Sequence, residues 1–319
     1  MKENKYYLGV DGGGSKTTAV VFNEKGEFIS RACGESINYY SVGIENARNA
    51  MADIISRLSQ KNFECAVIGM SALGERATDE ETARFCGGII ESKKIIMDSD
   101  LFIALEAMDE DGECAVVISG TGSMAVCRNE SGEISHAGGF GYILGDEGSG
   151  YSIGLNAIKS AIRAAESCTK ETELTQKCLD YFSIDNIYEL IDLYYNTTVS
   201  RKKTAAFAKE VMLCAENGDA TALSIIESEA HQLSQTALSL LKRKKSNIPI
   251  GLWGGVFQHN IIFRNKFIAI LSESGFDNVK LIDFTPEIGA IFACYRSEGI
   301  EIVDIIKDSV KSTCTQATL

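Results

Sequence analysis

The sequence predicts an α/β protein of two related domains, each a mixed five-stranded sheet flanked by helices. Three observations lead to this prediction. The 319 residues suit two domains of common size. A pattern of three short strands and two turns occurs near the start of the chain and again after residue 112. Helix-like and strand-like segments alternate after each copy, which is typical of sheets with both parallel and antiparallel pairs.

The repeated pattern predicts that the two domains arose by duplication. Residues 7–32 and residues 115–137 each show a strand, a glycine-rich turn, a strand, a charged turn and a strand. The segments between the turns are β-branched or apolar, as strands bounded by hairpin turns usually are. The turns of the first copy are Gly12–Ser15 and Asn23–Glu27, and those of the second copy are Ser119–Ser123 and Asn129–Glu133.

The segments after each hairpin set complete the two sheets. Apolar residues recur at helical spacing over residues 43–60, and short buried strands are predicted at 65–68 and 94–97. The second half holds a long helical block over about 150–243, which we interpret as an insertion. Further expected elements are helices at 79–91, 260–274 and 286–298 and strands at 249–253 and 279–282. The polar loop Asp109–Gly112 divides the predicted domains into residues 1–111 and 112–319.

Composition narrows the class of function. The formal net charge of −13 argues against a nucleic acid partner, because neutralising phosphates requires clustered Lys and Arg. No opening segment resembles a signal peptide, and no apolar run approaches the ~20 residues of a membrane span. The ten cysteines are scattered, without a CxxC pair or zinc-type spacing. We therefore expect a cytoplasmic protein that binds neither membrane nor nucleic acid.

Two glycine-rich turns are candidate phosphate-binding loops. Asp11–Thr17 follows a buried strand, and its consecutive glycines let backbone N–H groups approach an anion. The spacing is not that of a Walker A loop, and the segment after it resembles a strand, unlike the helix of a Rossmann fingerprint. A plain tight hairpin is the alternative. The second turn, Gly120–Ser123, favours the functional interpretation, because two such hairpins from related domains could hold one triphosphate. Gly254 and Gly255 end a third strand, where a flat adenine or ribose could lie against the backbone.

Asp100 is a candidate general base, because it ends a buried strand directly before an apolar helical stretch. A carboxylate at that place can accept the proton of an attacking hydroxyl. An ordinary helix N-cap is the alternative, and Asp98 is the competing carboxylate. The glycine-rich segment Gly138–Gly150 also contains apolar residues, so we interpret it as a ligand-shaped loop that presents Asp146 or Glu147 inward.

These motifs together resemble the BadF/BadG/BcrA/BcrD ATPase family, which includes the N-acetylglucosamine kinases, within the actin and sugar kinase superfamily. The resemblance covers residues from Gly9 to about Tyr295. It implies two ribonuclease H-like (actin-like ATPase) domains with an active-site cleft between them. The matching segments are Gly9–Thr17, Ile118–Ser123, Gly145–Ser149 and, less specifically, Trp253–Phe257 and Pro286–Ala290.

The resemblance implies a role for each matching residue. Asp100 would be the catalytic base, and Asp11 would lie near magnesium. Phe140 stands where mammalian-type enzymes have tryptophan, which leaves stacking on the sugar possible. The implied ATP-binding residues are Gly13, Gly14, Ser15, Lys16, Thr17, Gly120, Thr121, Gly122, Ser123, Gly254 and Gly255. The implied sugar-binding residues are Asn38, Thr121, Gly139, Phe140, Asp146 and Ser149.

The function that the resemblance implies is transfer of the ATP γ-phosphoryl to the 6-hydroxyl of an N-acetylated amino sugar, with Mg²⁺ as cofactor. N-acetylglucosamine, N-acetylmuramic acid and glucosamine all stay open as substrates, and a homodimer is expected. The alternative within the family is an ATP-driven activator of a dehydratase or reductase, which holds an iron–sulfur cluster through cysteines such as Cys127 or Cys168. A second alternative is a non-catalytic nucleotide-binding regulator.

Overall fold

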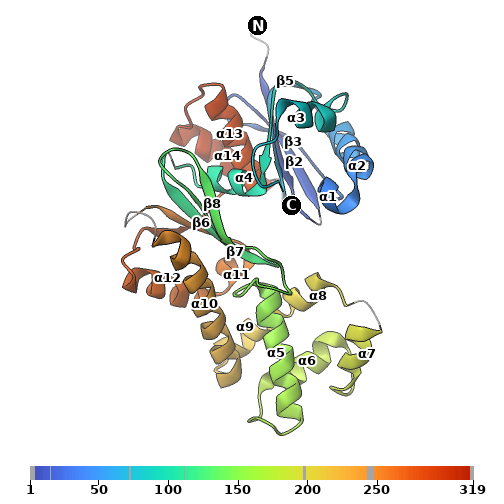
Figure 1. Cartoon of the computed structure of the whole chain (residues 1–319), viewed down its shortest axis with the longest axis vertical. Coiled ribbons are helices and arrows are strands. Elements are labelled where there is room, and N and C mark those ends of the chain that lie inside the picture. Colours follow the sequence, from blue (N-terminus) through green and yellow to red (C-terminus); the bar gives the residue numbers. More distant parts are fainter. Residues whose placement is uncertain are drawn as a thin grey trace. The chain divides into compact units, whose positions relative to one another are not determined.

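The computed structural model divides the chain into two compact units (Figure 1). Unit 1 comprises residues 1–111 and 282–319, and unit 2 comprises residues 112–281. The structure describes residues 4–14, 16–71, 73–110, 112–196, 199–242 and 248–316, with side chains up to residue 312. Ser15, one of the predicted ATP-binding residues, lies outside the described residues.

Unit 1 contains a five-stranded mixed sheet in the order β3-β2-β1-β4-β5. The first three strands pair antiparallel, whereas β4 and β5 run parallel to β1. The carboxyl ends of three parallel strands therefore meet at one edge of the sheet. The strands are β1 (Tyr6–Gly12), β2 (Thr17–Asn23), β3 (Phe28–Gly34), β4 (Asn62–Met70) and β5 (Glu91–Ser99).

Unit 2 repeats this sheet in the order β8-β7-β6-β9-β10. Its first three strands again pair antiparallel, and β9 and β10 run parallel to β6. The equal strand order and direction confirm the predicted fold class and the relation between the two halves. The strands are β6 (Cys114–Ser119), β7 (Ser123–Arg128), β8 (Ile134–Gly138), β9 (Ile250–Trp253) and β10 (Val279–Leu281).

Helices cover both faces of the unit 1 sheet. Leu8 and Val10 of β1 share a buried cluster with the apolar face of α2, including Met51. Gly9 points to the other face, where a Cβ would lie 2.4 Å from the Glu287 carbonyl oxygen of α13. Alternate residues of one strand thus face different helices. The helices of unit 1 are α1 (Tyr39–Val42), α2 (Ile44–Arg57), α3 (Asp79–Cys86), α4 (Asp100–Glu106), α13 (Pro286–Ser297) and α14 (Asp304–Gln316).

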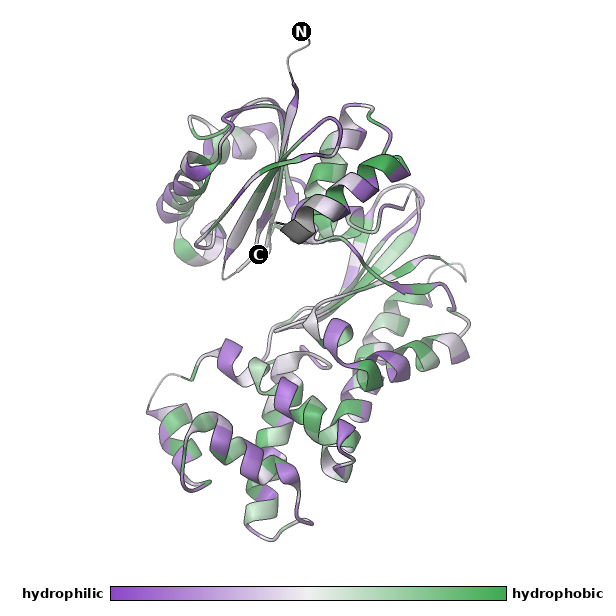
Figure 2. Cartoon of the chain, turned by 180° about the vertical axis from the view of Figure 1, so that it is seen from behind, coloured by the Kyte–Doolittle hydropathy of each residue, from purple (hydrophilic) through white to green (hydrophobic). Residues whose placement is uncertain are grey.

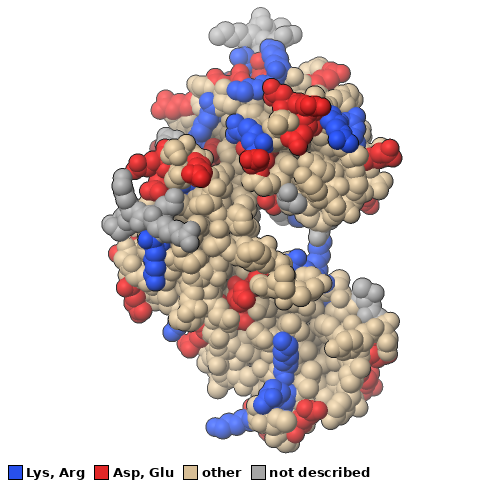
Figure 3. All heavy atoms as spheres, viewed as in Figure 1, with Lys and Arg blue, Asp and Glu red and all other residues tan. Residues whose placement is uncertain are grey.

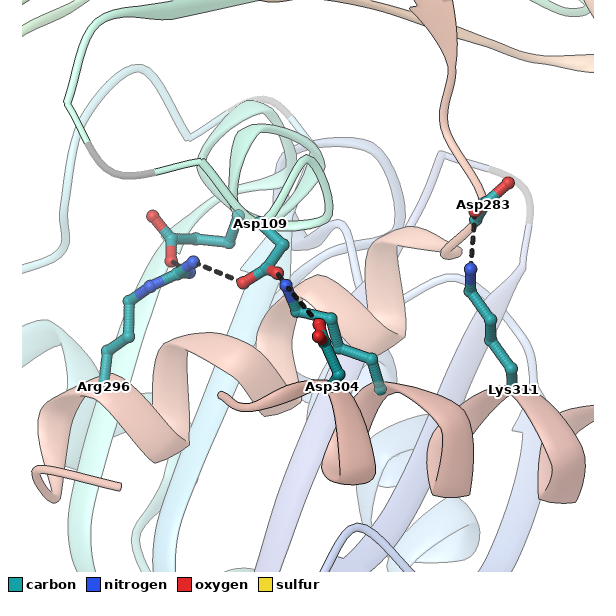
Figure 4. Close-up of polar contacts among 7 residues, drawn as sticks. Asp109, Asp283, Arg296, Asp304 and Lys311 are labelled. Carbon is teal, nitrogen blue, oxygen red and sulfur yellow. Dashed lines mark hydrogen bonds and ion pairs between the residues drawn. The ribbon is translucent and has the colours of Figure 1, made fainter. Parts of the chain in front are cut away.

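The final segment corrects the predicted domain assignment. The sequence placed residues 282–319 in the second domain, but α13 packs on β1, β4 and α4 of unit 1. Ion pairs fix the same segment, as Figure 4 shows. Arg296 of α13 contacts Glu106 and lies 2.9 Å from Asp109, which Lys307 of α14 also contacts. Within the segment itself, Lys311 lies 2.7 Å from Asp283. No local pattern predicts this return, because Arg296 and Glu106 are 190 positions apart in the chain.

Helices form most of unit 2, around a core shared with its sheet. Apolar residues recur along the helices and strands of both units in Figure 2. The predicted helical block is resolved into α5 (Gly150–Ala165), α6 (Glu173–Phe182), α7 (Glu189–Tyr195), α8 (Arg201–Ala206), α9 (Ala208–Glu216) and α10 (Ala220–Leu241). The helices α11 (Gly255–His259) and α12 (Ile261–Glu273) follow β9.

The surface shows how the charges are distributed. On the face drawn in Figure 3, Lys and Arg side chains lie among Asp and Glu side chains rather than in one continuous patch. Within the described part of the chain, none of the helices combines the length and the apolar character that crossing a bilayer requires.

The contact between α13 and α4 gives a stability prediction. Gly→Ala inside a helix ordinarily stabilises by about 1 kcal/mol. At Gly289 of α13, however, a Cβ would lie 2.0 Å from the Ile103 carbonyl oxygen. We therefore expect Gly289→Ala to destabilise by about 1–3 kcal/mol, measured by denaturant unfolding. Ser224→Ala, on the exposed side of α10, is the control and should leave stability nearly unchanged. A stabilised Gly289→Ala variant would contradict this packing.

Candidate functional site

The first glycine turn, between β1 and β2, is held from both sides by hydrogen bonds. The Gly12 carbonyl accepts from Ser71 N at 2.9 Å, and the Gly13 carbonyl accepts from Ser36 Oγ at 2.9 Å. A Cβ on Gly14 would meet only Ser71 Oγ, at 4.0 Å, so Gly14 faces open space. This geometry suits approach of an anion to the backbone. Lys16 is exposed beside it.

Thr17, which we predicted to bind ATP, is fully buried in unit 1. Its Oγ1 accepts a hydrogen bond from Ile37 N at 3.2 Å. The structure therefore gives Thr17 a role in holding the segment after β3 against the turn, rather than in direct contact with a ligand.

Asp11 lies at the carboxyl end of β1 and has an unusual environment. Burial, Glu287 and Asp100 together raise the pKa of its carboxyl group to about 7, and Lys16 opposes them. Among the described residues, none forms a hydrogen bond or ion pair with this carboxylate. A carboxylate held near other negative groups without a donor is stabilised when a cation binds.

Asp100 is not the N-cap of α4, which was the alternative interpretation of this residue. Ser99 is the N-cap of α4, and its Oγ accepts from Phe102 N at 3.2 Å. Asp100 is therefore the first helical residue, and burial raises the pKa of its carboxyl group while backbone N–H groups of Leu101 and Asp100 itself oppose the rise. A raised pKa brings a carboxylate closer to the range that suits a general base.

Asp98, the competing carboxylate, has structural partners. Its Oδ1 accepts from Ser99 N at 2.8 Å, and its Oδ2 accepts from Arg76 Nε at 2.9 Å. Both oxygens are thus used where β5 ends. The structure separates the two neighbouring aspartates and favours Asp100 as the reactive group.

Asn38 combines two structural contacts in unit 1. Its Oδ1 accepts from the backbone N–H groups of Tyr40 and Ser41 and so caps α1. Its Nδ2 donates to Ser71 Oγ at 3.1 Å. The amide has a second N–H for a ligand. Ser71 also holds the Gly12 carbonyl, so Asn38 is linked to the first glycine turn.

The second glycine turn, between β6 and β7, contains two glycines with different surroundings. A Cβ on Gly120 would have nothing within 4 Å. A Cβ on Gly122 would lie 2.6 Å from Arg201 Nη2 and 2.8 Å from Asp146 Oδ2. Gly120 therefore faces open space, whereas Gly122 makes room for an ion pair. The Gly254 backbone has φ 110°, and a Cβ there would lie 2.2 Å from the Ser119 carbonyl oxygen, so this glycine is required by packing.

The glycine-rich loop 138–150 is fastened to the rest of unit 2 by buried polar groups. Ser119 Oγ donates to the Gly148 carbonyl at 2.6 Å, and Ser123 Oγ donates to the Glu147 carbonyl at 2.7 Å. Glu229 of α10 accepts from Gly148 N at 2.5 Å, and it also accepts from Ser152 Oγ and Asn156 Nδ2. The loop is thus fixed and not a free linker.

Two other predicted sugar-binding residues of this loop have clear positions. Ser149 is fully buried, and its Oγ caps α5 by accepting from Ser152 N. This is a structural role, and its contact with the sugar stays a prediction. Gly139 has φ 77°, a conformation that favours glycine, and a Cβ there would lie 3.0 Å from Met124 Cε.

Asp146 is held in a strained, buried position. It has φ 66°, which is rare for a residue other than glycine, and it is 4% exposed. Burial raises the pKa of its carboxyl group, against the opposing effects of Arg201 and of the Ser123 and Gly141 N–H groups. Arg201 Nη2 lies 2.5 Å from its Oδ2. Strain of this kind is often kept where a side chain must be presented to a ligand.

Large apolar side chains of the same loop face solvent. The exposed fractions are 72% for Phe140, 78% for Ile143 and 79% for Leu144. Exposed apolar groups in a fixed loop are typical of a ligand or partner surface. Phe140 is therefore accessible to a ligand, and its stacking on a sugar stays a prediction.

A cavity of about 300 Å³ in unit 2 adjoins the second glycine turn. Its walls are mostly apolar, and the predicted ATP-binding residues Thr121 and Gly255 are among them. The lining residues are Gly120, Thr121, Gly150, Lys202, Ala205, Ala206, Ala208, Lys209, Met212, Gly255, Val256 and His259. An apolar slot with two lysines beside a glycine turn suits a flat base with attached phosphates.

The sequence reasoning missed Arg201, Glu229 and the wall of this cavity. Arg201, Glu229 and the wall residues from Gly150 to Met212 come from the helical block, which we interpreted only as an insertion. The basic run Arg201–Lys203 after the N-cap Ser200 was the only local signal. Arg201 contacts a residue 55 positions away, and Glu229 contacts residues 73 to 81 positions away, so spacing alone does not reveal these contacts.

The repeated sheets and glycine turns define a protein with paired actin-like ATPase domains. The model of the BadF/BadG/BcrA/BcrD ATPase family matches residues 8–293, and the chain belongs to this family.

Curated relatives match over nearly their whole length. An N-acetylmuramic acid/N-acetylglucosamine kinase of Clostridium acetobutylicum is 29% identical over 311 residues, covering 92% of this chain and 99% of that protein. An N-acetyl-D-glucosamine kinase of Dictyostelium discoideum is 26% identical over 314 residues, covering 92% and 98%. Among solved structures, a Chromobacterium violaceum protein described as a candidate N-acetylglucosamine kinase has a TM-score of 0.70 at 20% identity, covering 90% of this chain and 98% of that one. This structural likeness shows the fold.

The two cysteines named for the activator alternative have different environments. Cys127 is buried within β7, and Cys168 is exposed after α5. Iron–sulfur clusters are held by several Cys thiolates together, and among the described residues no group of three or more His, Cys, Asp or Glu side chains could hold a metal ion. The structure gives this alternative no specific support.

The open space at Gly120 gives a prediction about ATP. Gly120→Val should fold normally but bind ATP at least tenfold more weakly, because its side chain would occupy the space in front of the turn. Calorimetry with ATP and a melting curve measure the two effects. Gly122→Val is the comparison. It should lower the melting temperature, because the valine side chain would clash with the Asp146–Arg201 ion pair. Unchanged ATP affinity in folded Gly120→Val would contradict the assignment of this turn.

The environment of Asp11 gives a prediction about pH. Its folded pKa of about 7 exceeds the ordinary value of 3.8, so the folded protein holds the proton more tightly than the unfolded chain. The stabilising contribution is present below pH 4 and is lost as the pH rises through 7. Asp11→Asn should therefore be no more stable than the parent near pH 4 and clearly more stable at pH 8. Melting temperatures at both pH values test this, and an equal difference at both would contradict it.

Proposed function

We propose that this protein is an ATP-dependent kinase of N-acetylated amino sugars that phosphorylates the 6-hydroxyl. The observation that carries the proposal is Asp100. This carboxylate directly follows β5, the outer parallel strand of the unit 1 sheet, and Ser99 rather than Asp100 caps α4. Burial raises the pKa of the Asp100 carboxyl group. The name and coverage of the relatives support the substrate class.

The proposed binding of ATP rests on unit 2 and the first glycine turn. The cavity beside Gly120 and Thr121 suits the adenosine, with Lys202 and Lys209 as nearby cations. Gly13, Gly14 and Lys16 form an open anion-accepting turn in unit 1. Backbone N–H groups in such turns can neutralise phosphate oxygens without reorganisation.

Proposed sugar contacts come from groups whose positions are already fixed. Asn38 offers its remaining N–H, because its other contacts hold it in place. Asp146 can accept from sugar hydroxyls, and exposed Phe140 offers an apolar face. A polar site discriminates strongly between substrates, because a substrate that lacks the matching group leaves the buried polar groups of the site without hydrogen bonds.

Magnesium fits the carboxylate donor set of unit 1. Hard oxygen ligands suit Mg²⁺, which is commonly held by one or two carboxylates together with substrate phosphates. Among the described residues, no three side chains converge as a self-sufficient metal site. Asp11 would therefore hold the ion together with ATP, and the bound ion would neutralise phosphate charge. The stabilising effect of Mg²⁺ on the Asp11 carboxylate follows from its negative neighbours.

Phosphoryl transfer needs no covalent intermediate with the protein, so the side chains act mainly by positioning the reactants and stabilising charge. Asp100 would orient the 6-hydroxyl and accept its proton as the oxygen bonds to the γ-phosphorus, while ADP leaves. Its raised pKa makes it a stronger base than an exposed aspartate. We further expect the enzyme to act in the cytoplasm. We also expect it to be a homodimer, and light scattering of the purified protein tests this oligomeric state.

A panel assay tests the proposal directly. ADP release is measured with N-acetylglucosamine, N-acetylmuramic acid, glucosamine and glucose, and the phosphorylated carbon is identified by NMR. The proposal expects turnover of the N-acetylated sugars and a 6-phosphate product. Turnover of none of these sugars by a protein that binds ATP would overturn it.

The matched aspartates give a prediction for catalysis. Asp100→Asn should lower kcat by about 10²–10⁴-fold with little change in melting temperature, because general-base assistance is lost while Ser99 keeps the cap. Asp98→Asn should show the opposite: most activity retained and stability lowered, because its ion pair with Arg76 is broken. Normal turnover by Asp100→Asn with a dead, folded Asp98→Asn would show that the base was wrongly chosen.

A further inference from the structure

Arg201 of α8 lies at the meeting point of three parts of unit 2. Its Nη2 contacts Asp146 Oδ2 at 2.5 Å, and its guanidinium carbon lies 5.2 Å from the centre of the Tyr142 ring. The same nitrogen would be 2.6 Å from a Cβ on Gly122. The guanidinium is thus placed by a carboxylate, an aromatic face and the second glycine turn.

The ion pair with Asp146 leaves much of this group unused. A guanidinium has five N–H donors in a planar fork. The described residues give it hydrogen bonds only through Nη2, and its side chain is 39% exposed. Two contacts fix its orientation, so further bonds to a ligand would cost little side-chain entropy. If Arg201 served only to hold Asp146 in place, the one hydrogen bond between them would be enough, and the other N–H donors would have no use.

We propose that Arg201 is a specificity residue that receives the carboxylate of an acidic N-acetylated amino sugar. This inference rests on the proposed function, in which Asp146 accepts from sugar hydroxyls. A carboxylate attached to the sugar beside those hydroxyls would meet the exposed N–H groups of Arg201. Guanidinium and carboxylate match in shape and pair through two hydrogen bonds.

The charges around Arg201 favour a sugar substituent over a phosphate of ATP. Asp146 touches the guanidinium directly, and Glu147 adds further negative charge beside Asp146. A phosphate with two negative charges would be repelled there more strongly than a single carboxylate. The Tyr142 ring, 44% exposed, also offers a face for the apolar side of a sugar.

The experiment compares two enzymes with three sugars. The parent and Arg201→Gln are assayed with N-acetylglucosamine, N-acetylmuramic acid and the methyl ester of N-acetylmuramic acid. Glutamine carries no charge, and its amide ends two bonds short of the Nη2 position, so the bond to Asp146 is lost for all three sugars alike. The comparison between the sugars therefore isolates the effect on the carboxylate. We expect kcat/KM for the free acid to fall about 10- to 100-fold more than that for the ester or for N-acetylglucosamine. Calorimetry of sugar binding without ATP should show the same preference, and Arg163→Gln, an exposed arginine of α5, should behave as the parent.

Each outcome decides the inference. Equal losses for all three sugars would overturn it and show that Arg201 only positions Asp146 or serves ATP. Turnover of N-acetylglucosamine with rejection of the free acid by the parent would overturn it and leave the proposed function standing. Absence of turnover and binding with every sugar in the parent would overturn both.

Discussion

The parallel pairing of β1, β4 and β5 is the constraint on which the chemistry of unit 1 depends. Their register sets Asp11 opposite Gly69, and Gly69 opposite Asp98, so that the carboxyl ends of three strands share one edge. The helix α4 begins at that edge, which brings Asp100 close enough to raise the pKa of Asp11. Glycines at 9 and 289 let α13 approach closely enough for Glu287 to add its charge. Close packing of small residues thus creates a cluster of negative charge that a cation would relieve.

In unit 2, the buried carboxylate of Glu229 has a comparable importance. It joins α10 to α5 and to the loop 138–150 through three donors. Burial raises the pKa of this carboxyl group although those donors favour its charged form. With the loop fixed at Gly148, Asp146 is kept in its left-handed conformation, and Phe140 projects outward. Preorganised groups of this kind bind a ligand without losing energy to ordering.

The two units share a topology but differ in what they contribute. Unit 1 provides carboxylates and a glycine turn with an open tip, which suits proton transfer and cation binding. Unit 2 provides an apolar cavity, a second glycine turn and a rigid loop with a guanidinium, which suits recognition of a base and of a sugar. Duplication supplied the sheets, and the residues after each sheet, above all the helical block of unit 2, supplied the difference.

Local sequence determined the repeated hairpins, the strand and helix alternation, the two glycine turns and the position of Asp100 at a strand end. These features depend on residues close together in the chain, where periodicity and turn chemistry act directly. Only the tertiary structure decided that residues 282–319 pack in unit 1, that Ser99 and not Asp100 caps α4, that Thr17 and Ser149 are buried, and that Arg201 meets Asp146. Those outcomes depend on hydrogen bonds, ion pairs and close approaches between distant segments. Spacing along the chain carries no record of which distant groups will compete for the same partner.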